Sequence, residues 1–390
     1  MEMMIMYNIL TLNKIAKIGL AQLGDNYAVA DDTANPDAVL VRSASMHDTE
    51  LPESLLAIAR AGAGTNNIPI DKCTQKGIVV FNTPGANANA VKELVIAGML
   101  ISSRDVLGGI EWAKTLKGNG DQVGKLVEKG KSNFVGPEIK GKTLGVIGLG
   151  AIGLLVANAA VALGMSVVGY DPFLSEEGAN KLDSTVKVTD NLDDIYAASD
   201  YITIHVPLNP STKELINAES IAKMKDNVRI LNYARDGLVN STDILAGINS
   251  GKIAAYITDF ATDDILGEKG VIALPHLGAS TPESEENCAV MAANEVKAYL
   301  ETGSVINSVN LPNISLTKTS NPRFTVIHSN IPTILNQITA KFGDLGANIE
   351  NVQSKSRGDY AYTVLDVTGN TDGIEEQIKA IDGVIRVRAI

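Results

Sequence analysis

The feature that most constrains the fold is the alternation of strand-like and helix-like segments over the first three quarters of the chain. Segments rich in β-branched residues lie at 38–42, 78–81, 143–149, 166–170, 201–205, 229–233 and 253–259. Alternating strands and helices form parallel βαβ units, because each helix returns the chain to the same edge of the sheet. The sequence therefore predicts a doubly wound α/β architecture.

The apolar start of the chain, residues 1–10, has neither a basic region nor a small-residue cleavage site. It is therefore predicted to be the first strand rather than a signal peptide.

The pattern changes after residues 311–322 (LPNISLTKTSNP), whose two prolines and small polar residues predict a flexible linker. The remaining segments are of strand, helix, strand, strand, helix and strand type. They lie at 323–328, 332–345, 349–354, 360–367, 374–381 and 384–388. This βαββαβ order predicts a compact ferredoxin-like module.

Composition excludes several classes of function. The formal net charge of −12 disfavours nucleic acid and acidic membranes as partners, because like charges repel. The longest apolar stretch, at about 94–102, is too short to span a membrane. The two cysteines and four histidines show no metal-ligand spacing, and reduced thiols are expected in a cytoplasmic protein.

The strongest local motif is GLGAIG at residues 148–153, which follows a strand-like segment and opens an apolar helix. In that context the glycines let a dinucleotide's pyrophosphate approach the helix N-terminus, where free N–H groups favour negative charge. A carboxylate at the end of the next strand accepts hydrogen bonds from ribose hydroxyls and repels a 2′-phosphate, so NAD is predicted over NADP. The residues expected at the dinucleotide are Gly148, Gly150, Ala151, Ile152, Gly153 and Asp171.

A second strand end, at His205, Val206 and Pro207, is expected beside the cofactor. Carboxyl ends of strands face the ligand in this architecture. The alternative is that Pro207 merely turns the chain.

Three later residues have the types needed to oxidise a secondary alcohol by hydride transfer. His276 supplies a base, Arg235 supplies a cation for a carboxylate, and Asp264 supplies an acid that holds the base. Each follows or ends a predicted strand. Asp263 is adjacent to Asp264, and both could instead lie on a loop surface.

The motifs GLGAIG, HVPL, N-x-A-R and PHLGAST, with an acidic residue 29 positions beyond Arg235, resemble the D-isomer-specific 2-hydroxyacid dehydrogenases. This resemblance implies that Asp259 holds the nicotinamide carboxamide. It also implies that Val91, Ala234 and Gly278 lie near the cofactor.

The resemblance further implies two Rossmann-like domains with a cleft between them. A substrate-binding domain is expected at 1–89 with 283–312, and a NAD-binding domain at 90–282. The linker would then cover 313–322 and the C-terminal module 323–390.

Two positions depart from the family pattern. The family usually has Glu at position 264, and the shorter Asp264 reaches His276 less easily. It usually has Gly after the catalytic Arg, where this chain has Asp236.

The members that the chain most resembles oxidise 3-phosphoglycerate, which carries a phosphate as well as a carboxylate. A second cation is therefore needed. The resemblance implies Arg42, Ser43, Gly64 and Asn87 at the substrate, and Lys131 reaching a neighbouring subunit's site. Arg42 and Lys131 could instead be surface residues.

The C-terminal module resembles an ACT domain, a unit that senses amino acids. Serine-sensing members have H-x-N-x-P before the first helix and an Asn after it, matched here by His328, Asn330 and Asn348. L-serine is thus the expected effector. Alternatively, Asn330 merely caps the helix. ACT modules usually pair their sheets side by side, so the resemblance implies that the exposed edge of this sheet is an oligomer contact, in a homodimer or homotetramer.

Two other functions stay open. One is the oxidation of a different D-2-hydroxy acid, such as glycerate, lactate or 2-hydroxyglutarate. The other is a non-catalytic NAD-sensing regulator, since a fold does not fix a function.

Overall fold

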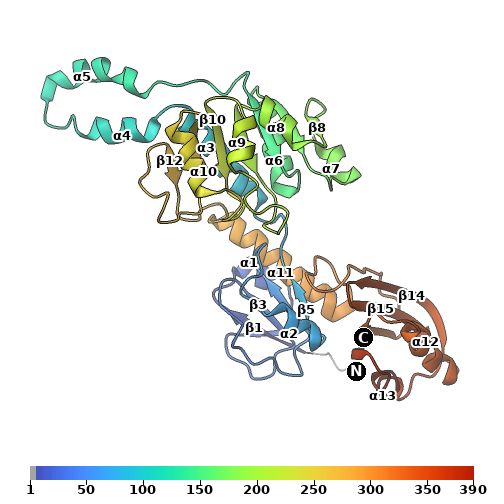
Figure 1. Cartoon of the computed structure of the whole chain (residues 1–390). Coiled ribbons are helices and arrows are strands. Elements are labelled where there is room, and N and C mark those ends of the chain that lie inside the picture. The colour runs from blue at the N-terminus through green and yellow to red at the C-terminus, as the bar shows by residue number, and fades with distance from the viewer. Residues whose placement is uncertain (1–5) are drawn as a thin grey trace. The chain divides into compact units, whose positions relative to one another are not determined.

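The computed structural model describes residues 6–390 and consists of two compact units, residues 1–87 with 282–390 and residues 88–281 (Figure 1). The first strand, β1, covers Tyr7–Leu12. The part of the predicted first strand at residues 1–5 lies outside the described residues.

The second unit, residues 88–281, is built on a seven-stranded parallel sheet in the order β12-β11-β10-β9-β6-β7-β8. The strands are β6 Thr143–Ile147, β7 Ser166–Tyr170, β8 Lys187–Thr189, β9 Tyr201–Ile204, β10 Val228–Asn232, β11 Ile253–Thr258 and β12 Val271–Ala273. The helices are α3 Ala88–Ser103, α6 Ala151–Ala162, α7 Glu176–Lys181, α8 Leu192–Ala198, α9 Ala218–Lys223 and α10 Ser241–Asn249. Strand order reverses between β6 and β9, which is where ligands bind in doubly wound sheets.

A helical arm projects from this unit (Figure 1). It contains α4 Val106–Lys114, the 3-10 turn Gly120–Gln122, α5 Val123–Gly130 and a second 3-10 turn, Lys131–Phe134. Neither α4 nor α5 has a buried residue. The rings of Trp112 and Phe134, 5.3 Å apart, hold the two ends of the arm together.

The first unit contains a five-stranded parallel sheet in the order β2-β1-β3-β4-β5. Its other strands are β2 Tyr27–Ala30, β3 Ala38–Val41, β4 Ala57–Arg60 and β5 Val79–Phe81, and its helices are α1 Lys17–Leu20, α2 Ile70–Gln75 and α11 Pro282–Thr302. The two parallel sheets confirm the predicted doubly wound architecture.

The C-terminal segment forms the predicted βαββαβ module, with an antiparallel sheet in the order β14-β15-β13-β16. Its elements are β13 Arg323–Ser329, α12 Ile334–Asp344, β14 Asn348–Arg357, β15 Tyr360–Thr368, α13 Ile374–Lys379 and β16 Val384–Ala389. The predicted elements differ from these by a few residues at their ends.

Within the predicted linker, residues 313–322, only Ile314 is buried, and most of the other residues are exposed. Leu311 and Ile314 are 1% exposed and belong to a core that also contains Tyr299 of α11 and Tyr362 of the module. One face of the module's sheet, with Ile327 and Tyr362, therefore packs into the core of the five-stranded sheet, while the module keeps a separate core of its own on its helices. The prolines and small polar residues of this segment are typical of a surface loop, but the apolar side chains between them, Leu311 and Ile314, are buried in a core.

A buried ion pair holds the start of the module in place. Arg323, fully buried, donates two hydrogen bonds to Asp366, at 2.6 and 2.9 Å. Its remaining donors reach the carbonyls of Thr302, Leu316 and Thr317. Removal of either partner would leave a buried charge without its counter-ion, which is strongly destabilising.

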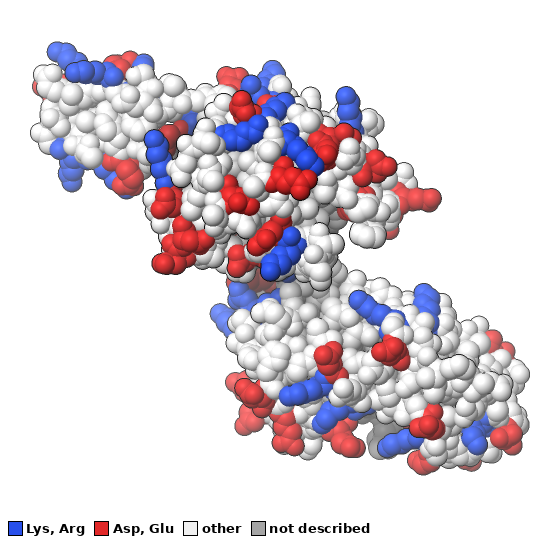
Figure 2. Space-filling model, viewed as in Figure 1, with Lys and Arg blue, Asp and Glu red and all other residues white. Residues whose placement is uncertain are grey.

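On the face shown in Figure 2, acidic and basic side chains are interspersed without a broad basic field. Within residues 6–390, no helix has the length and apolar character needed to cross a membrane. No cluster of three His, Cys, Asp or Glu suited to a metal occurs in the same part of the chain.

Candidate active site

The turn between β6 and α6 has no room for side chains at two positions. Gly148 has a φ of +92°, and a Cβ there would lie 2.6 Å from the carbonyl oxygen of His205. A Cβ on Gly153 would lie 1.8 Å from the carbonyl oxygen of Gly148. Gly150, by contrast, faces open space just before α6 begins at Ala151. A phosphate group can therefore approach this helix N-terminus closely, as a dinucleotide requires.

Asp171 lies directly after β7 and is tied to the same turn. Its Oδ2 accepts a hydrogen bond from the N–H of Leu149, and its Oδ1 accepts one from the N–H of Phe173, both at 2.9 Å. Each carboxylate oxygen keeps a further acceptor site. This arrangement fits a ribose with two free hydroxyls.

His205, at the end of β9, stays neutral. Burial lowers its pKa to about 3. Its Nε2 lies 2.9 Å from the hydroxyl of Thr203, and its Nδ1 is buried without a partner among the described residues. The ring therefore serves the site as a neutral group.

Asp259 follows β11 and is 2% exposed. Its Oδ2 accepts a hydrogen bond from the N–H of Gly278 at 2.8 Å, while its Oδ1 has no partner within residues 6–390. Burial raises the pKa of this carboxyl, although the Gly278 N–H and the charge of His276 oppose the rise. Val91 lies beside it, 3.6 Å from where a Cβ on Gly278 would be. A buried acceptor without a donor fits a carboxamide N–H₂ group.

Arg235 and His276 both lie close enough to Asp259 for their charges to lower its pKa. The guanidinium of Arg235 is exposed and donates one hydrogen bond to the carbonyl of Ala234. His276 has a φ of +48°, a conformation that costs energy for a residue with a side chain, and its ring lies 5.0 Å from that of Phe260. Strain of this kind is common at functional sites.

The predicted contact between Asp264 and His276 is not formed. Asp264 instead accepts a hydrogen bond from Thr262 at 2.5 Å. Hydrogen bonds from Thr262 and Ser241 hold the pKa of the Asp264 carboxyl below its usual value. The short Asp264 side chain bonds within its own loop, and Asp259 is an acid whose pKa the charge of His276 lowers.

The substrate residues predicted in the first unit cluster at the carboxyl ends of β3 and β4. Arg42 forms a 2.5 Å ion pair with Glu285, and the N–H of Ser43 donates to Asn13. The guanidinium of Arg60 donates to the carbonyls of Arg42 and Gly64. Sequence reasoning missed Arg60, although it ends an apolar strand in the same way that Arg42 follows one. Asn87, also predicted, is the last residue of this unit's first segment and is half-buried.

Residues 99–278 match the family model described as D-isomer specific 2-hydroxyacid dehydrogenase, NAD binding domain. A Schizosaccharomyces pombe protein assigned as a D-3-phosphoglycerate dehydrogenase is 30% identical over 87% of this chain and 75% of its own length. The chain belongs to the D-isomer-specific 2-hydroxyacid dehydrogenases.

Other family members extend this comparison. A D-3-phosphoglycerate dehydrogenase of Synechocystis sp. is 34% identical over 78% of this chain and 54% of its own length. The chain thus spans about half the length of several curated relatives that it matches. The NAD⁺-bound 3-phosphoglycerate dehydrogenase of Entamoeba histolytica is 26% identical, with a TM-score of 0.59 over 78% of this chain and 99% of that chain. The residues that match this family's NAD-binding domain, 99–278, lie within the unit formed by residues 88–281.

The three residues predicted to bind an effector are not brought together within one chain. His328 is 2% exposed, and its ring nitrogens lie near the carbonyl of Ser329 and the hydroxyl of Thr363. Asn330 donates to the carbonyl of Gly358, which follows the end of β14, whereas Asn348 begins β14. Asn330 also does not cap α12, whose N-cap is Thr333.

Lys131 lies on the helical arm and forms an ion pair with Glu128. The arm, with α4 and α5, projects from the body of its own unit (Figure 1).

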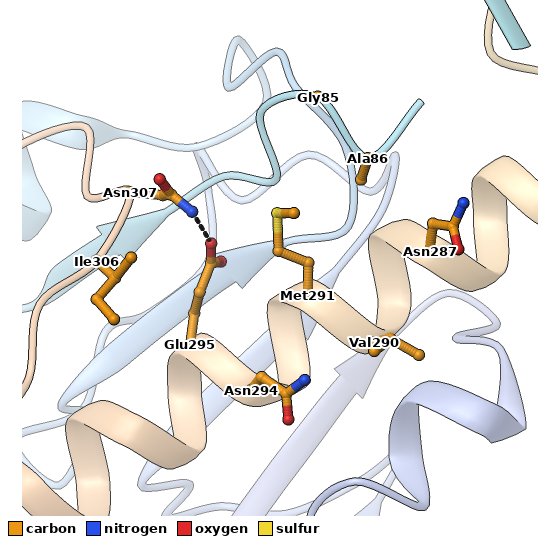
Figure 3. A pocket seen from close by; sticks show the side chains of 9 residues that line it. All are labelled: Gly85, Ala86, Asn287, Val290, Met291, Asn294, Glu295, Ile306 and Asn307. Carbon is orange, nitrogen blue, oxygen red and sulfur yellow. Dashed lines mark hydrogen bonds between the residues drawn. The ribbon is translucent and has the colours of Figure 1, made fainter. Parts of the chain in front are cut away.

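A cavity of about 500 Å³ in the first unit contains a carboxyl group that no sequence pattern indicated (Figure 3). Glu295 of α11 is 5% exposed; its Oε1 accepts a hydrogen bond from Asn307 at 2.7 Å, and its Oε2 has no partner among the described residues. Burial raises the pKa of Glu295 to about 8. Met291 and Ile306 supply apolar lining.

Replacement of Asp171 by Ala is expected to narrow the preference for NAD over NADP. The ribose then loses a charged acceptor, which should lower kcat/KM for NAD by about 10–100-fold, the usual value of a hydrogen bond to a charged group. Initial rates with both cofactors measure the ratio. Asp183→Ala, an exposed acid of the same unit, is the control. Equal loss with both cofactors would contradict a role in selectivity.

Glu295 should make the protein less stable as the pH rises. Below pH 4.5 the carboxyl is protonated in both states; between 4.5 and about 8 it ionises only when unfolded, so rising pH favours unfolding. The loss amounts to about 1.4 kcal/mol per pH unit and levels off above the folded pKa. Thermal midpoints of wild type and Glu295→Gln should therefore diverge over this range. Glu286→Gln, exposed on the same helix, should track the wild type, and parallel curves for all three would refute the assignment.

Proposed function

We propose that this family member is a NAD-dependent dehydrogenase that oxidises 3-phosphoglycerate to 3-phosphohydroxypyruvate, the first step of serine biosynthesis. The observation that carries the proposal is the grouping of Arg235 and His276 around the buried carboxylate of Asp259. The names of the relatives support the substrate. We also assign the protein to the cytoplasm, in keeping with the free thiols of Cys73 and Cys288.

The residues of the NAD-binding unit divide the work. NAD, when bound, supplies the hydride acceptor; Gly150 and Asp171 would hold its phosphates and ribose, and Asp259 its carboxamide. His276 takes the proton of the substrate hydroxyl. Asp259 and Asp264 stabilise the resulting imidazolium by their negative charge. Arg235 pairs with the substrate carboxylate, and Arg42 is assigned to the phosphate.

The module is proposed to bind L-serine between two copies of the chain. Asn348 and the Asn330 contact at Gly358 lie at opposite ends of β14, separated by about 30 Å at 3.3 Å per residue. One small ligand cannot touch both within one chain. β14 is an edge strand of the sheet, and antiparallel pairing of two β14 strands would set Asn348 of one copy near Asn330 of the other.

A homodimer follows from this pairing, and a homotetramer would follow if the helical arm forms a second contact. The arm exposes Val106, Leu107 and Ile110 at 38–48% of their surface. In such an assembly Lys131 of one copy could serve the site of another.

Replacement of His276 by Ala is expected to lower kcat by about 10²–10⁴, the usual contribution of general acid–base catalysis. NADH absorbance with 3-phosphoglycerate, glycerate, lactate and 2-hydroxyglutarate measures both rate and substrate class. His47→Ala removes an exposed histidine that bonds Asn66, and it should leave the rate unchanged. Asp264→Glu, which restores the family's longer side chain, should displace the pH profile. Faster turnover of another hydroxy acid would contradict 3-phosphoglycerate as the substrate. No turnover of any of them would favour the alternative of a non-catalytic NAD-sensing regulator.

Calorimetry with L-serine tests the proposed intersubunit site. Asn330→Ala and Asn348→Ala should each abolish binding, because each removes one half of every site. A mixture of the two variants, unfolded and reassembled together, should regain binding in mixed dimers, where one site has both asparagines. A mixture without binding, beside a wild-type control that binds, would contradict a shared site. Rates with serine then show whether binding inhibits.

A further inference from the structure

A second cavity, of about 380 Å³, lies where the C-terminal module meets the five-stranded sheet of the first unit. The module contributes β16 and the end of α13, and the sheet side contributes segments around Glu53 and Lys76. The residues that line it are Glu53, Leu56, Lys76, Lys379, Ile385, Arg386, Val387 and Arg388. Four cations and one carboxylate thus face one cavity in a chain whose net charge is −12.

The two guanidinium groups are fixed by carbonyl oxygens rather than by carboxylates. Arg386 donates to the carbonyls of Leu55 at 2.6 Å and Glu53 at 3.3 Å. Arg388 donates to the carbonyls of Tyr299 and Leu300, and it lies 4.7 Å over the Tyr299 ring. Carbonyl groups orient these cations, and Glu53 is the carboxylate of the lining whose charge acts on Arg386.

The lysines complete the cationic wall. Lys76 donates to the carbonyl of Leu51 at 2.6 Å and is otherwise exposed, and Lys379 is exposed at the end of α13. Among residues 6–390, none of the four cations forms an ion pair with a carboxylate. Burial even lowers the pKa of Arg386, which reflects the cost of holding its charge there.

We propose that this cavity binds a small, multiply charged oxyanion, such as a phosphate ester or a polycarboxylate. The planar guanidinium groups match two oxygens of one anion at once, and the lysines add mobile point charges. Because the guanidinium groups are already held by carbonyls, little side-chain entropy is lost on binding. The volume falls within the range of small-molecule sites.

Such an anion would couple the module to the substrate-binding sheet. It would contact β16 and α13 on one side and Lys76 on the other, so it would bind the docked module better than a displaced one. A ligand that prefers one of two states shifts the population toward that state. The close contact at Gly77, where a Cβ would lie 2.8 Å from the Cβ of Arg386, shows how tightly the two parts meet beside the cavity.

The test is calorimetry with inorganic pyrophosphate on the full chain, at fixed ionic strength and with excess NAD to fill the nucleotide site. We expect saturable binding of one pyrophosphate per chain. Lys76→Ala and Lys379→Ala should each weaken it by about tenfold through the loss of a charge-assisted hydrogen bond, and the double variant should abolish it. Both lysines are exposed, so the variants should fold.

Lys341→Ala, on α12 of the same module, removes the same charge outside the cavity and should bind pyrophosphate as the wild type does. If Lys341→Ala weakens pyrophosphate binding as much as the cavity variants do, the loss comes from the overall electrostatic field of the protein, and the cavity is not the site. Wild-type affinity in the double variant, or no saturable binding at millimolar concentration, would overturn the site. Citrate and orthophosphate distinguish the two ligand sources: binding of citrate alone identifies a polycarboxylate, and binding of the phosphates alone identifies a phosphate ester.

Discussion

The NAD-binding unit depends on how closely β6 approaches the start of α6. A side chain at Gly153 would push the start of α6 away from the end of β6, and one at Gly148 would collide with the backbone of His205 after β9. The N–H of Leu149 in this turn donates to Asp171, and the backbone carbonyl of His205 lies beside the turn. The phosphate cradle, the ribose acceptor and the adjoining strand end are thus consequences of one steric constraint.

The same edge of the sheet carries the groups that we propose to react. Parallel strands end together, so loops far apart in the sequence converge on one line of carboxyl ends. Several of these loops meet at Asp259. Its carboxylate accepts a hydrogen bond from the N–H of Gly278, and the charges of Arg235 and His276 lower its pKa. A buried carboxylate oxygen without a hydrogen-bond donor is destabilising, and a ligand that donates a hydrogen bond to Oδ1 would remove this cost.

Sequence patterns predicted the fold well because strand periodicity, glycine motifs and turn residues are local signals. They failed where tertiary packing decided. The segment around Ile314 has the composition of a loop but enters a core, and Asn330 has the type of a helix cap but bonds the β14–β15 turn. Asp264 was identified by spacing, yet side-chain length directs it to Thr262. No local sequence pattern marks Glu295 or Arg386, because the environment of each side chain is formed by residues that are distant in the sequence.

The architecture of the module explains how it could respond to two different ligands. Its sheet has two edges, β14 and β16, separated by β13 and β15. Asn348 begins β14 and Asn330 bonds Gly358 beyond its other end, whereas the β16 edge presents Arg386 and Arg388 to the cavity beside the five-stranded sheet. His328 on β13 joins the interior strands through Thr363, which in turn bonds Ser354 of β14. A change in how β14 pairs can therefore reach β16 through a continuous set of hydrogen-bonded strands. β16 in turn contacts Leu55 and Gly77, which precede β4 and β5, so such a change would reach the five-stranded sheet at the amino ends of two strands.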